Sequence, residues 1–321
     1  MIKEADLGNY SSKDSFGNIF ESKVSSIPST LSDKYVLELD GETYYLGKGE
    51  FDTEYRKIYK KSYFQLLYGL LCMSSKEVTN EIKLVVGLPL SQFKKDKELL
   101  REMILSKYIL AGTFNGYERN FVVTDCEVYL EGIASVPIDY EGVFVDVGGR
   151  TTDAGITYME DGKRKVENPY SLPKGTINLY SDFIKLINVN HGLDLNTNKA
   201  KRVIINGLYI KNKRVDISKE MKIFKEYLDG LISDLNVQYS LNTNAVTFTG
   251  GGSLDLSKSI KRRVEHAVIL EDSLFSNAYG FREFGRSVWE KWKYQLVLKK
   301  VKKIYMIIFL LKEIIACISR I

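Results

Sequence analysis

The stretch Val143-Phe144-Val145-Asp146-Val147-Gly148-Gly149-Arg150-Thr151-Thr152-Asp153 is the strongest indication of fold in this sequence. A short apolar run, typical of a buried strand, ends on a carboxylate and is followed by two glycines, two hydroxyls and a second carboxylate. Glycines let backbone N–H groups approach a ligand closely, and the two threonine hydroxyls add hydrogen-bond donors. Asp146 would then orient a metal-bound water. The stretch predicts a turn that binds a phosphate tail together with its metal.

Two further segments show the same pattern of a strand that runs into glycine. Asp6-Leu7-Gly8-Asn9 follows Ile2–Ala5, and Lys13 comes soon after as a mobile charge for phosphate. Val246–Ser253 is a short strand followed by three glycines, with a helix expected after Ser253. Each segment alone is weak, because such sequences are common in ordinary turns and connectors. Their order is informative, because one phosphate turn begins each half of the chain and a glycine turn closes the second half.

This order of motifs resembles the actin-like ATPase superfamily, and within it the plasmid-segregation actins of the ParM/StbA type. Asp6–Lys13 is similar to the first phosphate loop of the family, Asp146–Asp153 to the second, and Gly250–Ser253 to the adenosine loop. Thr124-Asp125-Cys126-Glu127-Val128 with Gly132-Ile133-Ala134 resembles the first connecting segment, and Asn277–Phe281 resembles the second. The resemblance covers roughly residues 1–285.

The resemblance implies an α/β, actin-like fold, which is a duplicated ribonuclease H-like fold of two domains with a nucleotide in the cleft between them. Residues 1–141 would form domain I and residues 142–276 domain II. Residues 277–321 would return to domain I and then form a basic and apolar helical extension. Closure of such a cleft on a nucleotide is a hinge motion, which couples the phosphate state to the shape of the molecule.

The same resemblance implies the site residues. Glu127 would position the attacking water, and Asp6 and Asp146 would act in catalysis and hold Mg²⁺ largely through water. The residues expected to bind ATP or ADP are Gly8, Asn9, Lys13, Gly148, Gly149, Thr151, Thr152, Gly250, Gly251, Gly252 and Ser253. Arg150 stands where the family usually has a small or hydroxyl residue. For the family's base-clamping helix the candidates are Lys199, Lys201 and Arg202.

The implied function is an ATPase that couples hydrolysis to assembly of a homopolymer filament, with GTP as an alternative nucleotide. Such filaments move plasmid DNA through a DNA-bound adaptor, so direct binding of nucleic acid is not expected. Polymerisation rests on the resemblance alone. Two alternatives remain open: a membrane-associated actin-like protein of cell shape or division, and a small-molecule kinase of the same superfamily. Such kinases commonly carry larger insertions than a chain of this length can hold.

Composition excludes several other classes. The 321 residues suffice for two domains, and the net charge of +5 is too small to argue for nucleic acid. Cys72, Cys126 and Cys317 have no CxxC spacing, which disfavours a metal site or disulfide framework and favours reduced thiols in the cytoplasm. No signal peptide is visible at the polar N-terminus. Neither of the two histidines lies near a nucleophile signature, which disfavours a Ser-His or Cys-His hydrolase.

The C-terminal segment 289–321 alternates aromatic and aliphatic residues with lysines and contains the apolar run Ile304–Leu311. That run is shorter than the ~18–20 residues that a membrane span needs. Three roles remain open: a terminal helix packed on its own or a neighbouring subunit, an amphipathic helix at a membrane surface, or a contact with an adaptor or nucleic acid.

Periodicity and turn signals predict most of the local structure. We expect hairpins around Asp40-Gly41 and Asn115-Gly116 and a buried strand over Ile82–Leu88. We also expect a long helix over Asp52–Met73, a helix capped by Ser91, and helices over Glu127–Ser135, Gly175–Asn188 and Lys219–Leu241. The N-terminus of the helix over Gly175–Asn188 would face the nucleotide.

Overall fold

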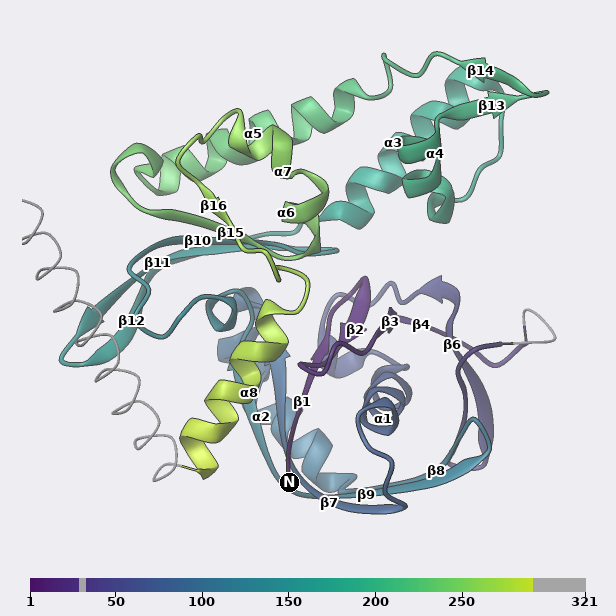
Figure 1. The fold of residues 1–321 in the computed structure, drawn as a ribbon, viewed down its shortest axis with the longest axis vertical. Coiled ribbons are helices and arrows are strands. Elements are labelled where there is room, and N and C mark those ends of the chain that lie inside the picture. The colour runs from purple at the N-terminus through teal and green to yellow at the C-terminus, as the bar shows by residue number, and fades with distance from the viewer. Residues whose placement is uncertain (29–32, 291–321) are drawn as a thin grey trace, which may run out of the picture.

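The computed structural model describes residues 1–28 and 33–290, and these residues form two lobes stacked along the long axis of the molecule (Figure 1). The first lobe consists of the elements up to residue 135 together with the last helix, α8 (Ser276–Trp289). The second lobe consists of the elements between residues 142 and 269. Each lobe is built on its own sheet, with a separate buried core.

The first sheet has the strand order β3-β2-β1-β7-β9-β8-β5-β6-β4. Its strands are β1 (Ile2–Leu7), β2 (Ser11–Lys13), β3 (Ile19–Glu21), β4 (Lys23–Ser25), β5 (Val36–Leu39), β6 (Glu42–Phe51), β7 (Thr79–Leu88), β8 (Ile109–Phe114) and β9 (Tyr117–Leu130). The helices of this lobe, besides α8, are η1 (Lys57–Tyr59), α1 (Tyr63–Met73), α2 (Leu90–Ser106) and η2 (Ile133–Ser135). The sheet curves around α1, whose apolar residues fill the core of the lobe. The central strands β1, β7 and β9 are parallel.

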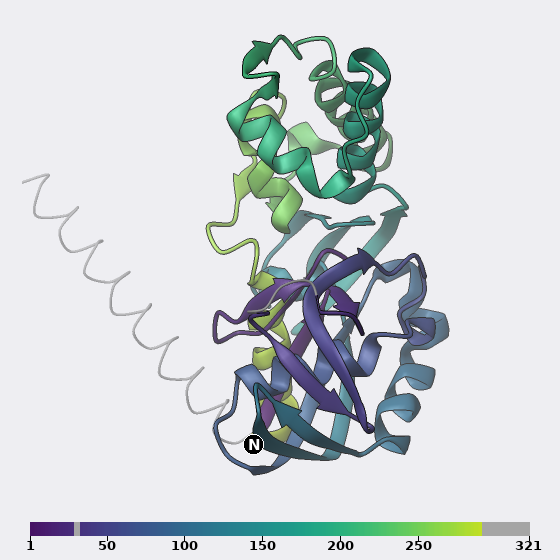
Figure 2. The same cartoon turned by 90° about the vertical axis from the view of Figure 1, so that its right-hand side faces the viewer.

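The second sheet has the order β12-β11-β10-β15-β16. Its strands are β10 (Gly142–Val147), β11 (Thr152–Glu160), β12 (Lys163–Leu172), β15 (Val246–Thr249) and β16 (Val268–Ile269), and the helices with it are α3 (Thr176–His191), α5 (Lys222–Gln238), η4 (Leu241–Thr243), α6 (Gly251–Asp255) and α7 (Ser257–Lys261). A small unit of η3 (Thr197–Lys199), α4 (Ala200–Asn206), β13 (Leu208–Ile210) and β14 (Lys213–Val215) packs on α3 at the outer end of the lobe (Figure 2).

Both predicted hairpins are confirmed. Asp40 and Gly41 have φ of 56° and 82°, and Asn115 and Gly116 have φ of 51° and 81°. Positive φ at both central residues is the type I′ geometry that matches the twist of the flanking strands, and Asn or Asp followed by Gly tolerates it best. The strand over Ile82–Leu88 is also confirmed within β7, and the helix over Gly175–Asn188 is confirmed as α3.

The prediction of one helix over Asp52–Met73 is wrong in its first half, where only η1 is helical, and right in its second half, which is α1. The backbone groups of residues 52–57 find partners elsewhere. The guanidinium of Arg150 donates to the carbonyls of Asp52 and Thr53, and the Lys57 amide donates to Oε1 of Gln92. Because these carbonyl and N–H groups have partners outside the segment, they do not need the hydrogen bonds of a helix.

Two other helix predictions also need correction. The helix over Glu127–Ser135 is wrong, because β9 pairs with β7 as far as Leu130 and only η2 is helical. The alternating burial of Cys126 and Val128 is the strand signal at this place. Ser91 is not a cap, since α2 begins at Leu90 after Pro89, and the Ser91 hydroxyl is 2.9 Å from the hydroxyl of Tyr55.

Helix α8 returns the chain to the first lobe and packs on β1, β7 and η2. The closest approach is at Gly280, where an added Cβ would overlap the carbonyl oxygen of Ala134. Phe281 is fully buried beside Val85 in the same contact. Glycine at this position therefore permits the backbones of α8 and η2 to touch.

We predict that Gly280→Ala destabilises the protein by about 1–3 kcal/mol, because the backbone atoms that it would meet cannot move without displacing α8. The matched control is Gly230→Ala in the exposed middle of α5, where nothing lies within 4 Å of the added Cβ. That control should gain roughly 0.5–1 kcal/mol from helix propensity. Equilibrium unfolding in urea measures both, and equal stabilities of the two variants would contradict the prediction.

Candidate functional site

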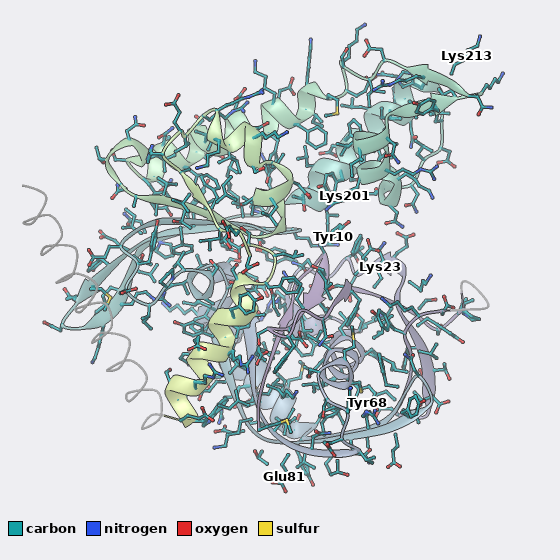
Figure 3. The ribbon with its side chains drawn as sticks, viewed as in Figure 1. Tyr10, Lys23, Tyr68, Glu81, Lys201 and Lys213 are labelled. Carbon is teal, nitrogen blue, oxygen red and sulfur yellow. The ribbon has the colours of Figure 1, made fainter. Side chains whose placement is uncertain are left out.

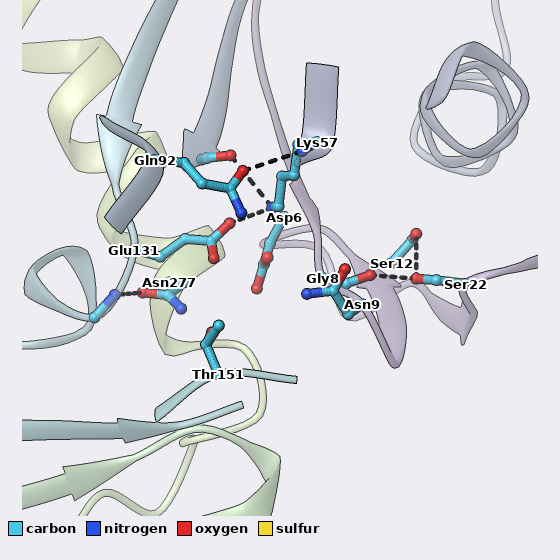
Figure 4. A network of polar contacts seen from close by, with 12 residues as sticks. Asp6, Gly8, Asn9, Ser12, Ser22, Lys57, Gln92, Glu131, Thr151 and Asn277 are labelled. Atoms are coloured by element: carbon cyan, nitrogen blue, oxygen red, sulfur yellow. Dashed lines mark hydrogen bonds and ion pairs between the residues drawn. The ribbon is translucent and has the colours of Figure 1, made fainter. Parts of the chain in front are cut away.

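A cavity of about 400 Å³ lies between the two lobes and receives the predicted glycine turns from both sides. The predicted residues that line it are Asp6, Gly8, Asn9, Lys13, Asp146, Gly148, Gly149, Thr151, Gly250, Gly251 and Gly252. They come from the ends of β1, β10 and β15, which meet at the cleft. Figure 4 shows Asp6, Gly8 and Asn9 on one side of this space and Thr151 on the other. The three turns therefore share one cavity.

Three predicted residues do not line the cavity. The Thr152 hydroxyl donates to the carbonyl of Lys174 at 2.9 Å, and the Ser253 hydroxyl donates to the carbonyl of Thr249 at 2.5 Å. Both hydroxyls therefore hydrogen-bond to the backbone next to the turns and do not face the cavity. Glu127 lies within β9 opposite Val85, before the strand reaches the cleft. Its side chain is not part of the cavity wall, in contrast to the role predicted for it.

The first turn is held by the hairpin of β1 and β2. Asp6 pairs with Lys13 across this hairpin, and the Lys13 ammonium lies 3.0 Å from a carboxylate oxygen of Asp6. The Ser22 hydroxyl donates to the carbonyl of Gly8 at 2.6 Å. Because C=O and N–H point in opposite directions across a trans peptide, the N–H of Asn9 points away from Ser22.

The second turn is held by the N-terminus of α3. The amides of Thr176 and Ile177 donate to the carbonyls of Gly148 and Gly149, at 3.1 and 2.8 Å. The N–H groups of the next residues, Gly149 and Arg150, therefore point away from the helix. The first amides of α3 thus fix the turn, and only Thr176 of this helix lines the cavity.

The third turn follows β15, which pairs with β10 so that Thr249 stands beside Asp146. Gly250 has a φ of 83°, and a Cβ there would overlap a carboxylate oxygen of Asp146. Only glycine fits this position, for reasons of both backbone conformation and space. The pairing of β10 with β15 thus brings the second and third turns to the same edge of the sheet.

Glu131 is a site residue that the sequence analysis missed. It follows β9 directly, lines the cavity and forms an ion pair with the buried ammonium of Lys57. Lys57 also donates to the carbonyl of Gly87 at 3.2 Å. Glu131-Gly132 repeats the pattern of a carboxylate and a glycine at a strand end, and this signal could have identified it. The prediction of a helix over residues 127–135 concealed the strand end.

Asn277, at the start of α8, connects the cavity to the link between the lobes. Its amide nitrogen donates to a carboxylate oxygen of Asp146 at 2.8 Å, and its amide oxygen accepts from the Gly132 N–H at 2.9 Å. The segment Asn277–Phe281 was identified from the sequence as a connecting helix, but its first residue was not recognised as part of the site. Figure 4 shows the Asn277 side chain, with its hydrogen bond drawn as a dashed line.

The buried charged side chains of the cavity are those of Asp6, Lys13, Glu131, Asp146 and Asp153. Burial raises the pKa of Asp146 to about 6 and that of Asp153 to about 7, and the neighbouring carboxylates act in the same direction. Burial also raises the pKa of Glu131, against the opposing effect of Lys57. Burial alone would lower the pKa of Lys13, but Asp6, Asp146 and Glu131 together raise it. The cavity is thus an environment in which added positive charge is favourable.

The outer end of the cavity is lined by Tyr10 and Lys201 (Figure 3). The Lys201 ammonium lies 5.2 Å from the centre of the Tyr10 ring and 2.9 Å from a carboxylate oxygen of Asp255. Of the three candidates for a base-clamping helix, Lys201 lines the cavity, whereas Lys199 and Arg202 do not.

Further contacts join the lobes beside the cavity. The Lys23 ammonium donates to the side-chain carbonyl of Asn198 at 2.8 Å. Arg150 points out of the cavity, and its guanidinium donates to the carbonyls of Asp52 and Thr53 at 2.5 and 3.1 Å. These contacts tie the two lobes together outside the cavity wall.

The described residues limit how a metal could be held. Among residues 1–28 and 33–290, no group of three or more histidine, cysteine or carboxylate side chains is arranged to enclose a metal ion. A hard cation in the cavity would keep much of its water, as Mg²⁺ does. The same residues contain no helix long and apolar enough to cross a bilayer.

We predict that the ligand-free protein loses stability as the pH rises from about 4 to 7. A carboxyl whose folded-state pKa is raised binds its proton more tightly than in the unfolded chain, where the pKa is about 3.9, so the folded state is favoured at low pH and penalised above its own pKa. Asp153→Asn should remove much of this penalty. It should raise the thermal midpoint at pH 8 by several degrees and leave it nearly unchanged at pH 4.5, since 1 kcal/mol moves such a midpoint by roughly 2–4 °C.

The control for this measurement is Asp161→Asn in the exposed turn between β11 and β12. Thermal unfolding is followed in the presence of a chelator, so that no divalent cation contributes. A midpoint for Asp153→Asn that stays at or below that of the wild type at pH 8 would contradict the assignment of the raised pKa to Asp153.

Two family models match the chain. One, described as the N-terminal domain of actin-like proteins, matches residues 5–133, and one described as the C-terminal part of archaeal actin homologues, MreB-like, matches residues 144–262. Together the two matches span about three quarters of the chain. Among curated protein sequences, none matches this chain.

Solved structures with the same fold have low sequence identity. A ParM from Clostridium botulinum, solved as a 15-stranded filament, is 22% identical, with a TM-score of 0.75 over 89% of this chain and 99% of that one. An archaeal actin homologue in complex with ADP is 21% identical, with a TM-score of 0.72 over 88% of this chain and 98% of that one. The actin-like protein Alp7A is 16% identical, with a TM-score of 0.69 over 94% and 99%.

These structures confirm the predicted two-domain actin-like fold, and the family models confirm the resemblance that the three turns indicated. The two matched segments also correspond to the two lobes that enclose the cavity. This chain belongs to the actin-like protein superfamily.

Proposed function

We propose that this protein is an ATPase of the actin-like type that binds ATP with Mg²⁺ between its lobes and assembles into filaments. The observation that carries the proposal is the single cavity into which Asp6 and Lys13 project from one lobe and Asp146 with its glycine turn from the other. A volume of about 400 Å³ falls within the usual range for small-molecule sites, roughly 300–1,000 Å³.

The phosphates would lie between the first two turns. The N–H groups of Asn9, Gly149 and Arg150, which point away from the groups that fix their turns, would donate to phosphate oxygens. Lys13 adds a buried positive charge on the side of the first lobe. The adenosine would extend past Gly250–Gly252 toward the outer end of the cavity. Thr152 and Ser253, predicted as ligands, would support the turns from behind.

Asp6 and Asp146 fit the requirements of a magnesium site. Both are buried carboxylates at strand ends, and the pKa of Asp146 is raised to about 6 by burial, so a nearby cation would stabilise its charged form. The ion would be held through water and phosphate oxygens, and it would neutralise charge that develops on the transferred phosphoryl group. Asn277 keeps the Asp146 carboxylate oriented.

Glu131 replaces Glu127 as the proposed residue that positions water. In hydrolysis, a water oxygen bonds to the terminal phosphorus while the bond to the leaving diphosphate breaks, and the protons of the water pass to phosphate oxygens and solvent. Glu131 lines the cavity and is held by Lys57, so its carboxylate can accept a hydrogen bond from the attacking water. Such positioning and charge neutralisation are most of what phosphoryl transfer requires.

We predict that Glu131→Gln lowers the rate of ATP hydrolysis by about 10²–10⁴ and leaves nucleotide affinity within a few-fold, because the amide cannot take up a proton or orient water equally well. The matched control is Glu127→Gln within β9, four residues before Glu131, and this variant should hydrolyse ATP at the wild-type rate. Phosphate release and equilibrium binding of a fluorescent ATP analogue measure the two effects. Loss of hydrolysis in Glu127→Gln together with normal turnover in Glu131→Gln would assign the positioning of water to Glu127, as predicted from the sequence.

Filament formation is supported by similarity of fold, since the ParM of similar fold was solved as a filament and is covered over 99% of its length. We propose the division into residues 1–141, 142–276 and 277–321, which agrees with the separate sheets and with the return of α8 to the first lobe. In the cytoplasm, such filaments would segregate plasmid DNA through a DNA-bound adaptor. Residues 1–290 carry 38 basic and 40 acidic side chains, which does not favour direct binding to nucleic acid.

Assembly is tested by sedimentation and negative-stain microscopy with ATP, with ADP and without nucleotide. We expect filaments above a critical concentration with ATP and Mg²⁺, and fewer or none with ADP. Asp146→Asn should abolish magnesium-dependent assembly, whereas Asp139→Asn, in an exposed loop, should assemble normally. ATP turnover that is independent of protein concentration, without filaments in any nucleotide state, would overturn the filament proposal and leave the nucleotide site standing.

A further inference from the structure

A second cavity, of about 550 Å³, opens on the surface beside α8, away from the three turns. We call it the α8 groove and define it by Tyr129, Pro137, Ile138, Arg164, Tyr279 and Phe284. Both lobes contribute to it: β9, the segment after η2 and α8 from the first, and β12 and the loop after β16 from the second. Figure 1 shows α8 and β12 on the same side of the molecule.

The groove has an apolar surface that the described residues leave uncovered. Ile138 is 54% exposed and Tyr279 is 39% exposed. The rings of Tyr129 and Phe284 stack with their centres 4.0 Å apart at an interplanar angle of 13°. A rigid aromatic pair with exposed apolar neighbours is the kind of surface that gains free energy when another apolar segment covers it.

The charged residues around the groove are mainly acidic. Glu271, Asp272 and Glu283 line it, and among the described residues only Glu283 of these three has an ion-pair partner, Arg286 at 2.7 Å. Arg164 also lines the groove, but its guanidinium is occupied, because it donates to the Tyr129 hydroxyl and to the carbonyls of Val136 and Pro137. The groove therefore favours an apolar occupant that carries positive charge.

The sequence after α8 has this composition. Residues 291–321, which lie outside the described residues, contain eight basic side chains and one acidic side chain, and Ile304–Ile318 is apolar except for Lys312 and Glu313. The segment starts one residue beyond the helix that forms a wall of the groove. As a helix, residues 304–318 would be about 22 Å long, against about 21 Å for the 14 residues of α8. Residues 291–303 are long enough to reverse direction between them.

We propose that residues 291–321 fold back along α8 and occupy the α8 groove of their own chain. The apolar side chains of 304–318 cover Ile138, Tyr279 and Phe284, and the lysines at 299–303 face Glu271 and Asp272. This selects the first of the three roles that the sequence leaves open for the segment. It does not depend on nucleotide hydrolysis or on filaments, and it implies that a second copy or a partner that uses this face must first displace the segment.

Zero-length cross-linking of the full chain tests the position and the origin of the occupant. A carbodiimide joins lysine ammonium groups to carboxylates only where the two are in contact. In an equal mixture of unlabelled and nitrogen-15-labelled protein, we expect links from residues 299–303 to Glu271 or Asp272 within single-isotope chains. If half of the links join a labelled chain to an unlabelled chain, the groove is occupied by the segment of a second copy, and the proposal is wrong. Absence of links to these carboxylates would also overturn the proposal.

A pair of surface variants tests the apolar contact. Ile138→Asp places a carboxylate in the groove, and we expect trypsin to cleave after Lys312 about tenfold faster, because the segment is released. Val189→Asp on α3, where the side chain is 80% exposed, is the control and should stay within twofold of the wild type. A single cooperative thermal transition shows that Ile138→Asp is folded. Equal cleavage rates in both variants would overturn the proposal.

Sedimentation with lipid vesicles tests the alternative that residues 291–321 bind a membrane surface. The wild-type chain is sedimented with vesicles of equimolar phosphatidylcholine and phosphatidylserine, and we expect it to remain in the supernatant because the apolar side of the segment is already covered. Pelleting of the wild type with loss of its cross-links to Glu271 and Asp272 would assign residues 291–321 to a lipid surface and reject the intramolecular contact.

Discussion

The cost of bringing several carboxylates together in one buried place constrains the whole structure. Asp6, Asp146 and Glu131 end three strands from two lobes, and Asp153 stands beside Asp146 on the next strand. Carboxylates this close and this buried resist full ionisation, as the raised pKa of Asp146 and Asp153 indicates. Lys13 and Lys57 offset only part of the repulsion. The cleft therefore gains stability from positive charge placed beside these carboxylates.

The sequence predicted the turns because their chemistry is local. Gly148 and Gly149 follow Asp146 within three residues, and Gly250 has a φ of 83° that favours glycine, so this part of the pattern can be recognised without knowledge of the fold. Glu131-Gly132 carries the same local signal, but the family resemblance pointed to Glu127, and the predicted helix concealed the strand end. Only the pairing of β9 with β7 as far as Leu130 shows which of the two carboxylates reaches the cleft.

The errors in secondary structure have a common physical origin in partners that are distant along the chain. Residues 52–57 lost their predicted helix to Arg150 and Gln92, which are about 100 and 35 residues away. Arg150 was the departure from the family pattern that the sequence analysis noted, and its guanidinium joins the lobes outside the cavity. Helical periodicity measures only the face that a helix would bury, so it cannot detect hydrogen bonds that a distant side chain offers to the backbone.

Helix α8 physically connects the two cavities. At its start, Asn277 donates to Asp146 and accepts from Gly132, so the helix is attached both to a carboxylate of the cleft and to the link between the lobes. Further along, Tyr279 and Phe284 form a wall of the α8 groove, and Gly280 holds the helix against η2. A change in the charge or position of Asp146 therefore acts on the same rigid element that shapes the groove. Helix α8 is therefore the element that the two cavities share, because Asn277 lines the first and Tyr279 and Phe284 line the second.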